Sequence, residues 1–132
     1  MKPPHTVAII QARMSSSRLP GKVLREIAGR PMLAWVVERT RRARMIDQVL
    51  VATTSESGDD PIADYCRSQG YPVYRGSLHD VLDRYYQAAR QAGAENVVRI
   101  TADCPLIDPV VVDRTVEAFR GAPLPHLQCL NP

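Results

Sequence analysis

The feature that most restricts the fold is the alternation of short apolar runs with amphipathic segments. Residues 7–10 and 49–52 are continuous apolar runs, and 96–101 holds a third, with Val97, Val98 and Ile100. Continuous apolar runs of this length are typical of strands buried on both faces of a parallel sheet. The segments between them have helical spacing of their apolar residues, as parallel crossovers require. The pattern predicts an α/β fold, a mostly parallel sheet with helices on both faces.

Four strand–helix units are expected along the chain. The expected strands are 7–10, 48–53, 71–74 and 96–101, and the expected helices are 32–43, 61–69, a helix ending near 92 after a capping signal at 77–80, and 109–120. Pro31 is suited to begin the first helix, Gly70 to end the second and Asp108 to cap the last. Residues 1–120 therefore form one expected domain. Residues 121–132 hold three prolines without periodicity and are predicted to be an irregular tail.

The segment Gln11–Lys22 follows the first expected strand and is rich in cations and hydroxyls. It combines Arg13, Arg18 and Lys22 with three serines and a Pro-Gly turn signal. Burying three unpaired charges would be costly, so this segment is expected to be an exposed loop. Ligands of open α/β sheets bind at this carboxyl edge, and cations with backbone N–H groups suit a polyphosphate. A basic surface loop without a ligand is equally compatible with the composition.

Two common nucleotide-binding motifs are absent. A Walker A loop needs a glycine where Ser16 stands and a hydroxyl where Val23 follows Lys22, which excludes a P-loop kinase or ATPase. No Gly-x-Gly-x-x-Gly occurs, which argues against a dinucleotide dehydrogenase.

Composition and charge narrow the classes of protein to which the chain can belong. With 132 residues, 45% of them hydrophobic and 23% charged, the chain suits one globular domain. The net charge of +3 favours acidic ligands over nucleic acid, and the arginines at 39–44 are interpreted as the solvated face and end of a helix. No apolar run approaches a membrane span and the N-terminus lacks a signal-peptide pattern, so we expect a cytoplasmic protein without membrane partners. The cysteines 66, 104 and 129 are scattered and are expected to be reduced thiols, with Cys66 packed in a helix.

Asp103 is the main candidate metal ligand. It comes just after the strand 96–101, so its carboxylate is expected in the same crevice as the basic loop. One carboxylate with substrate phosphates is a typical Mg²⁺ environment. Alternatively, Asp103 only caps the turn at Pro105. The carboxylates of residues 54–60 are expected to cap a helix rather than bind metal.

Three motifs resemble the cytidylyltransferase family, which includes the CMP-Kdo and CMP-sialic acid synthetases and the SpsF-type spore coat polysaccharide biosynthesis proteins. Ala12-Arg13 followed by Ser17-Arg18-Leu19-Pro20-Gly21-Lys22 resembles the family's N-terminal signature. Ala102-Asp103-Cys104-Pro105-Leu106-Ile107 resembles its Gly-Asp-x-Pro-Leu-Ile motif, with alanine in place of glycine. The run from Gly76 to Tyr85 is similar to the spore-coat branch, which fits best.

The resemblance implies a Rossmann-like nucleotidyltransferase, in which a sugar or sugar-acid hydroxyl attacks the α-phosphate of CTP and releases pyrophosphate. Arg13 and Lys22 would be the catalytic phosphate cations, and Asp103 would hold the cofactor Mg²⁺. The residues implied to contact the nucleotide are Gln11, Ala12, Arg13, Ser17, Arg18, Gly21, Lys22, Ser77 and Arg84.

The resemblance runs from about residue 7 to about residue 119, the N-terminal half of the family's domain. Relatives continue with more sheet, which carries the sugar pocket, a further metal carboxylate and much of a homodimer interface. Two alternatives stay open. One is a glycosyltransferase using a sugar nucleotide, although Asp103 is followed by Cys104 and lacks an Asp-x-Asp motif. The other is a truncated nucleotide-binding module without turnover.

Overall fold

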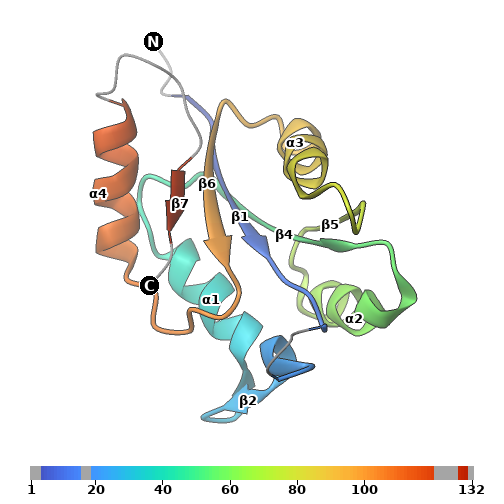
Figure 1. The fold of residues 1–132 in the computed structure, drawn as a ribbon. Helices are drawn as coiled ribbons and strands as arrows, with labels where there is room; N and C mark the ends of the chain where they lie inside the picture. Colours follow the sequence, from blue (N-terminus) through green and yellow to red (C-terminus); the bar gives the residue numbers. More distant parts are fainter. Residues whose placement is uncertain (1–3, 16–18, 121–127, 131–132) are drawn as a thin grey trace.

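Five parallel strands form the central sheet of the computed structural model, which describes residues 4–15, 19–120 and 128–130. Neighbouring strands follow the order β5-β4-β1-β6-β7, and each pairing is parallel (Figure 1). The strands are β1 (Thr6–Gln11), β4 (Gln48–Thr54), β5 (Val73–Gly76), β6 (Asn96–Thr101) and β7 (Gln128–Leu130). The predicted parallel α/β fold is confirmed.

The strand order contains one reversal. The chain builds outward from β1 through β4 to β5, then returns to the other side of β1 with β6 and continues to β7. Counted along the chain, this is the 3-2-1-4-5 order of a Rossmann-like sheet. The reversal places a switch point between β1 and β6, outside the carboxyl ends of the two strands, where open α/β sheets bind their ligands.

Helices cover both faces of the sheet, as predicted. They are α1 (Met32–Arg41), α2 (Asp60–Gln69), α3 (Val81–Gln91) and α4 (Pro109–Arg120). Side chains alternate between the faces along each strand. Ile10 belongs to a core shared with α1, α2 and α4, whereas Ile9 belongs to a smaller core with Tyr85 and Ala88 of α3. The helix α3 therefore lies alone on its face of the described sheet (Figure 1).

Local sequence signals determine where most of the helices begin and end. Gly70 ends α2 at φ +71°, and Asp108 Oδ1 accepts a hydrogen bond from the N–H of Val110 at the start of α4. The strand predicted at 71–74 lies at Val73–Gly76 instead. The reason is that the N–H of Tyr71 donates to Cys66 O and closes α2, so the ladder with β4 begins at the carbonyl of Pro72.

The prediction of an irregular tail for residues 121–132 needs correction at 128–130. These residues form β7, which pairs with β6 in the register Val98 to Gln128. Pairing satisfies the backbone groups along this edge of β6, which no periodicity in the tail could predict.

A small hairpin joins the basic loop to α1. The strands β2 (Glu26–Ile27) and β3 (Arg30–Pro31) are antiparallel and meet at Ala28 and Gly29, which have φ of 52° and 82°. The two short strands are not predicted from the sequence. The indole N–H of Trp35 donates to Ile27 O at 2.7 Å and fixes the hairpin to α1.

One arginine of α1 is half-buried and not fully solvated as predicted. Arg39 Nε donates to Ile107 O at 2.8 Å and ties α1 to the loop before α4. Arg41, Arg42 and Arg44 are exposed, as the interpretation of a solvated face requires. In the described part of the chain, no helix is long and apolar enough to cross a membrane.

Candidate functional site

A pocket lies at the switch point, where β1 and β6 end side by side. Its volume is about 260 Å³. It is lined by Gln11, Arg13, Ser15, Lys22, Val23, Thr101, Ala102 and Asp103. The parallel pairing of Gln11 with Thr101 brings the basic loop and the Asp103 segment to the same edge. Four residues singled out in the sequence, Gln11, Arg13, Lys22 and Asp103, thus meet in one pocket.

Backbone hydrogen bonds fold the basic loop back on itself. The N–H of Gly21 donates to Met14 O at 2.7 Å, and Gly21 has φ +76°, which favours glycine. Lys22 follows at once and begins a short 3₁₀ turn, η1 (Lys22–Leu24). Gly21 is not among the residues that line the pocket, so its role in the structure is to close the loop and place Lys22.

The loop is also anchored to the other side of the crevice by Asp59. This carboxylate is 4% exposed and accepts hydrogen bonds from the N–H of Met14 at 2.8 Å and from the Thr54 hydroxyl. Asp59 occupies the N-cap position of α2, yet its side chain makes no cap hydrogen bond. The expectation that this carboxylate caps a helix is therefore wrong, and Asp59 holds the β1 loop to the end of β4 instead.

Arg13 stands between two neighbouring pockets. The second pocket, about 390 Å³, is lined by Arg13, Met14, Ser15, Glu56, Gly58, Asp59 and Leu78. Arg13 Nη2 donates to Ser15 Oγ at 2.7 Å, whereas its buried Nε has no hydrogen-bond partner. Because Arg13 and Ser15 line both pockets, one elongated ligand can extend along this edge of the sheet.

Two predicted contact residues use their polar groups within the protein. The N–H of Ala12 donates to Ala52 O at 3.0 Å, and Ala12 is 1% exposed. The side chain of Gln11 lines the pocket, and its Oε1 accepts a hydrogen bond from the Tyr85 hydroxyl at 2.7 Å. Tyr85 is not identified from the sequence, because a tyrosine on the apolar face of a helix reads as a core residue.

Ser77 and Arg84 lie behind the site and do not line either pocket. Arg84 is fully buried, and its Nη1 donates to Ser77 O at 2.6 Å, while Nε and Nη2 have no partner. Burial lowers the pKa of Arg84, and the nearby charge of Arg13 lowers it further. Ser77 Oγ accepts from the N–H of Asp80. Both residues therefore stabilise the segment that carries Leu78. The other two predicted contact residues, Ser17 and Arg18, lie outside the described residues.

The residues that line the pocket fit a metal ion that is bound partly by the protein and partly by a ligand. Asp103 is exposed and lines the pocket with Lys22 and Arg13. Among the described residues, no three His, Cys, Asp or Glu side chains gather as a metal cluster. A single carboxylate beside two cations fits Mg²⁺ that takes its other ligands from an anionic ligand and water.

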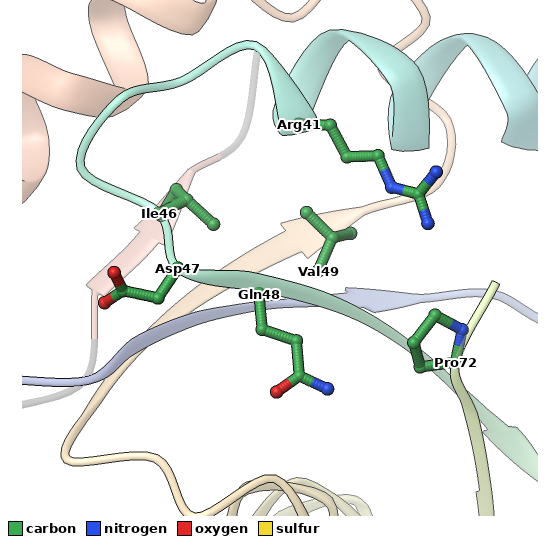
Figure 2. A pocket seen from close by; sticks show the side chains of 6 residues that line it. All are labelled: Arg41, Ile46, Asp47, Gln48, Val49 and Pro72. Carbon is green, nitrogen blue, oxygen red and sulfur yellow. The ribbon is translucent and has the colours of Figure 1, made fainter.

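A third pocket lies away from these residues. It has a volume of about 240 Å³ and is lined by Arg41, Ile46, Asp47, Gln48, Val49 and Pro72 (Figure 2). Gln48 begins β4 and Pro72 precedes β5, so this pocket is at the amino edge of the sheet. It contains none of the residues singled out as a candidate site.

The fold and the pocket together define a Rossmann-like domain with a cationic crevice at its switch point. A family model of cytidylyltransferases matches residues 7–129, and the chain belongs to the cytidylyltransferase family. The resemblance inferred from the three sequence motifs is thereby confirmed.

The relatives support the same family. The chain is 44% identical over 126 residues to the 3-deoxy-manno-octulosonate cytidylyltransferase of Geobacter sulfurreducens, covering 94% of this chain and 49% of that protein. It is 38% identical over 127 residues to the spore coat polysaccharide biosynthesis protein SpsF of Bacillus subtilis, covering 93% and 53%. The chain spans about half the length of these curated relatives.

Two solved structures of similar proteins have the same fold. A cytidylyltransferase from Leptospira borgpetersenii matches with a TM-score of 0.84 and 36% identity, over 91% of this chain and 50% of that one. A CMP:2-keto-3-deoxy-manno-octonic acid synthetase complexed with CTP matches with a TM-score of 0.75 and 29% identity, over 90% and 48%. The Rossmann-like nucleotidyltransferase fold implied by the motifs is thus confirmed.

Proposed function

We propose that this chain forms the nucleotide-binding part of a CTP-dependent nucleotidyltransferase that activates a sugar or sugar acid and releases pyrophosphate. One observation carries the proposal. Arg13, Lys22 and Asp103, from segments far apart in the sequence, line one pocket at the switch point of the sheet. Two cations beside an exposed carboxylate suit a metal-bound triphosphate better than they suit a neutral ligand.

Arg13 and Lys22 are proposed to bind the β- and γ-phosphates. In nucleotidyl transfer, negative charge builds on the departing pyrophosphate, and cations already in place stabilise it without reorganisation. Lys22 is half-buried, and η1 fixes its backbone. Arg13 has a buried Nε without a partner, and its position between two pockets lets it contact phosphates near their junction with the nucleoside.

Asp103 is proposed to hold Mg²⁺. Mg²⁺ held there would supply positive charge that reduces the repulsion between the phosphates. The part of Asp103 is to fix one ligand position beside Lys22, at the end of a strand whose pairing with β1 sets its place. Thr101 and Ala102 complete that wall of the pocket.

The cytidine is proposed to occupy the second pocket. Leu78 offers it an apolar side chain, and Glu56 and Gly58, which follow β4 in the chain, also line this pocket. The segment Gly76–Ser77, behind Leu78, is held by the buried Arg84. This placement puts the base near Ser77 and Arg84, which the sequence resemblance implies as nucleotide contacts.

The acceptor, the assembly and the location are proposed from the relatives named above. SpsF and the 3-deoxy-manno-octulosonate cytidylyltransferases support a role in surface polysaccharide precursors. We propose a sugar-acid acceptor, a homodimer as the assembly of the whole protein and a cytoplasmic location. Spore coat synthesis is the most specific form of the proposal, because it is the named role of SpsF.

Titration calorimetry with CTP, UTP, GTP and ATP, each with and without Mg²⁺, tests the proposal. Binding that prefers CTP and strengthens with Mg²⁺ is expected. Pyrophosphate release in the presence of CTP and 3-deoxy-manno-octulosonate would separate an enzyme from a binding module without turnover. Tight binding of a UDP- or GDP-sugar in preference to CTP would instead indicate a glycosyltransferase.

A further inference from the structure

A line of three side chains crosses the α3 face of the sheet and ends in the pocket. Arg99 of β6 lies with its guanidinium 4.2 Å from the ring centroid of Tyr85, and the hydroxyl of Tyr85 donates to Gln11 Oε1 at 2.7 Å. Tyr85 is 4% exposed, so this contact is shielded from water. Ile9 pairs with Arg99 and Gln11 with Thr101 in the parallel register, which places Arg99 and Gln11 on the same face.

The direction of the hydrogen bond has a physical cause. A phenol hydroxyl can donate or accept, and a side-chain amide offers either an oxygen or an N–H group. A cation over the ring draws electron density from the phenol, which makes its hydroxyl a better donor and a poorer acceptor. Arg99 therefore favours donation by Tyr85, and donation requires the carbonyl of Gln11, not its amino group, to face Tyr85.

The hydrogen bond from Tyr85 determines which group of the Gln11 side chain faces the pocket. With Oε1 held by Tyr85, the Nε2 amino group of Gln11 is left to face the pocket that it lines. We propose that Tyr85 is a positioning residue for ligand binding, which fixes Gln11 as a hydrogen-bond donor to the bound nucleotide. The group that it recognises is an acceptor, either a phosphate oxygen or an acceptor atom of the nucleoside. This inference rests on the proposed nucleotide site.

A packing role alone makes a different prediction. Tyr85 also belongs to the smaller core, with Ile9, Ala52 and Ala88. If only the ring mattered, Tyr85→Phe would leave ligand affinity unchanged, because phenylalanine keeps the same ring. The neighbouring Tyr86 supplies a matched control, since it is on the same helix but 59% exposed.

The test is a double-mutant cycle read by calorimetry with CTP and Mg²⁺. Tyr85→Phe is expected to raise Kd about fivefold to tenfold, the effect of losing one ordered hydrogen bond, while Tyr86→Phe leaves Kd within twofold. In a Gln11→Ala background, Tyr85→Phe is expected to have no further effect. An unchanged Kd in Tyr85→Phe, or the same rise in both backgrounds, would overturn the inference.

Two further arms distinguish the outcomes. Tripolyphosphate with Mg²⁺ identifies the contact, because Tyr85→Phe weakens its binding if Gln11 donates to a phosphate and leaves it unchanged if Gln11 donates to the nucleoside. The side-chain amide resonances of Gln11 in ¹⁵N NMR require no nucleotide. They are expected to shift in Tyr85→Phe and not in Tyr86→Phe, and identical spectra would overturn the positioning role. Failure of the wild-type chain to bind any nucleotide would instead overturn the proposed function.

Discussion

The carboxylate of Asp59 accepts a hydrogen bond at 2.8 Å from the backbone N–H of Met14, 45 residues earlier in the chain. This bond joins the loop after β1 to the loop after β4 across the carboxyl edge of the sheet. Met14 also accepts from the N–H of Gly21, so the same residue closes the basic loop. The position of Arg13 and Lys22 therefore depends on a carboxylate that lines the second pocket and not the pocket formed by Lys22 and Asp103.

Removal of this anchor is expected to weaken both the fold and the site. Asp59→Ala leaves the Met14 N–H and the Thr54 hydroxyl without their acceptor, and we expect a loss of about 2 kcal/mol in the free energy of unfolding. Urea denaturation measures it. Asp64→Ala is the control, because the Asp64 side chain is 75% exposed and only pairs with Arg67 on the helix surface. Equal stability of the two variants would contradict the role given to Asp59.

Gly76 is expected to tolerate no side chain. A Cβ at this position would lie 2.7 Å from Cε1 of Tyr74 and 3.1 Å from Cγ of the buried Arg84. Gly76→Ala should therefore cost about 1–3 kcal/mol of stability, as overpacking does. Gly58→Ala, where no atom lies within 4 Å of the added Cβ, should change stability by less than about 0.5 kcal/mol. Thermal unfolding of both variants checks the difference.

Stability is expected to fall at alkaline pH because of Cys66. Burial raises the pKa of this thiol from 9.0 to about 12. Between these values the unfolded chain loses the proton and the folded chain keeps it, so the free energy of unfolding falls as pH rises from 9 to 12. The slope approaches about 1.4 kcal/mol for each pH unit.

The Cys66→Ala variant isolates this contribution. Tyr71 also has a pKa raised to about 12, by burial and by its hydrogen bond to Glu38, and it contributes a similar slope above its ordinary value in both proteins. The wild-type chain should therefore lose more stability than Cys66→Ala between pH 9 and pH 11, measured by urea titration. Parallel pH profiles would show that the thiol ionises freely in the folded state.

Asp103→Asn is expected to remove the metal dependence of CTP binding. The amide keeps the shape of the side chain but removes the charge that Mg²⁺ needs. Affinity measured with Mg²⁺ should fall at least tenfold, whereas affinity in EDTA should stay the same or rise slightly. Asp64→Asn on the exposed face of α2 serves as the control for surface charge. A Mg²⁺ effect of wild-type size in Asp103→Asn would place the metal elsewhere.

The periodic parts of the fold are predictable from the sequence. The strand predicted at 96–101 and the helix predicted at 109–120 coincide with β6 and α4, because their apolar residues recur with the period of the element. The crevice is predictable for a related reason. Gln11 and Asp103 both follow buried parallel strands, whose carboxyl ends must share one edge of the sheet.

The residues that support the crevice are not predictable in the same way. Asp59 reads as a helix cap and Tyr85 as a core residue, and each acts through a partner far away in the sequence, 45 and 74 residues respectively. Such contacts are set by tertiary packing and leave no local pattern. The strand β7 and the shift of β5 likewise depend on which backbone groups of a neighbouring element remain to be paired.

The affinity of Lys22→Ala for CTP in the presence of Mg²⁺ tests the central claim most directly. Calorimetry should show a Kd at least tenfold weaker than that of the wild-type chain, because a half-buried cation at the proposed triphosphate site is lost. Arg25→Ala, which removes an exposed cation three residues away, should bind as the wild type does within about twofold. Equal affinity of Lys22→Ala and the wild-type chain would contradict the assignment of this pocket to the triphosphate.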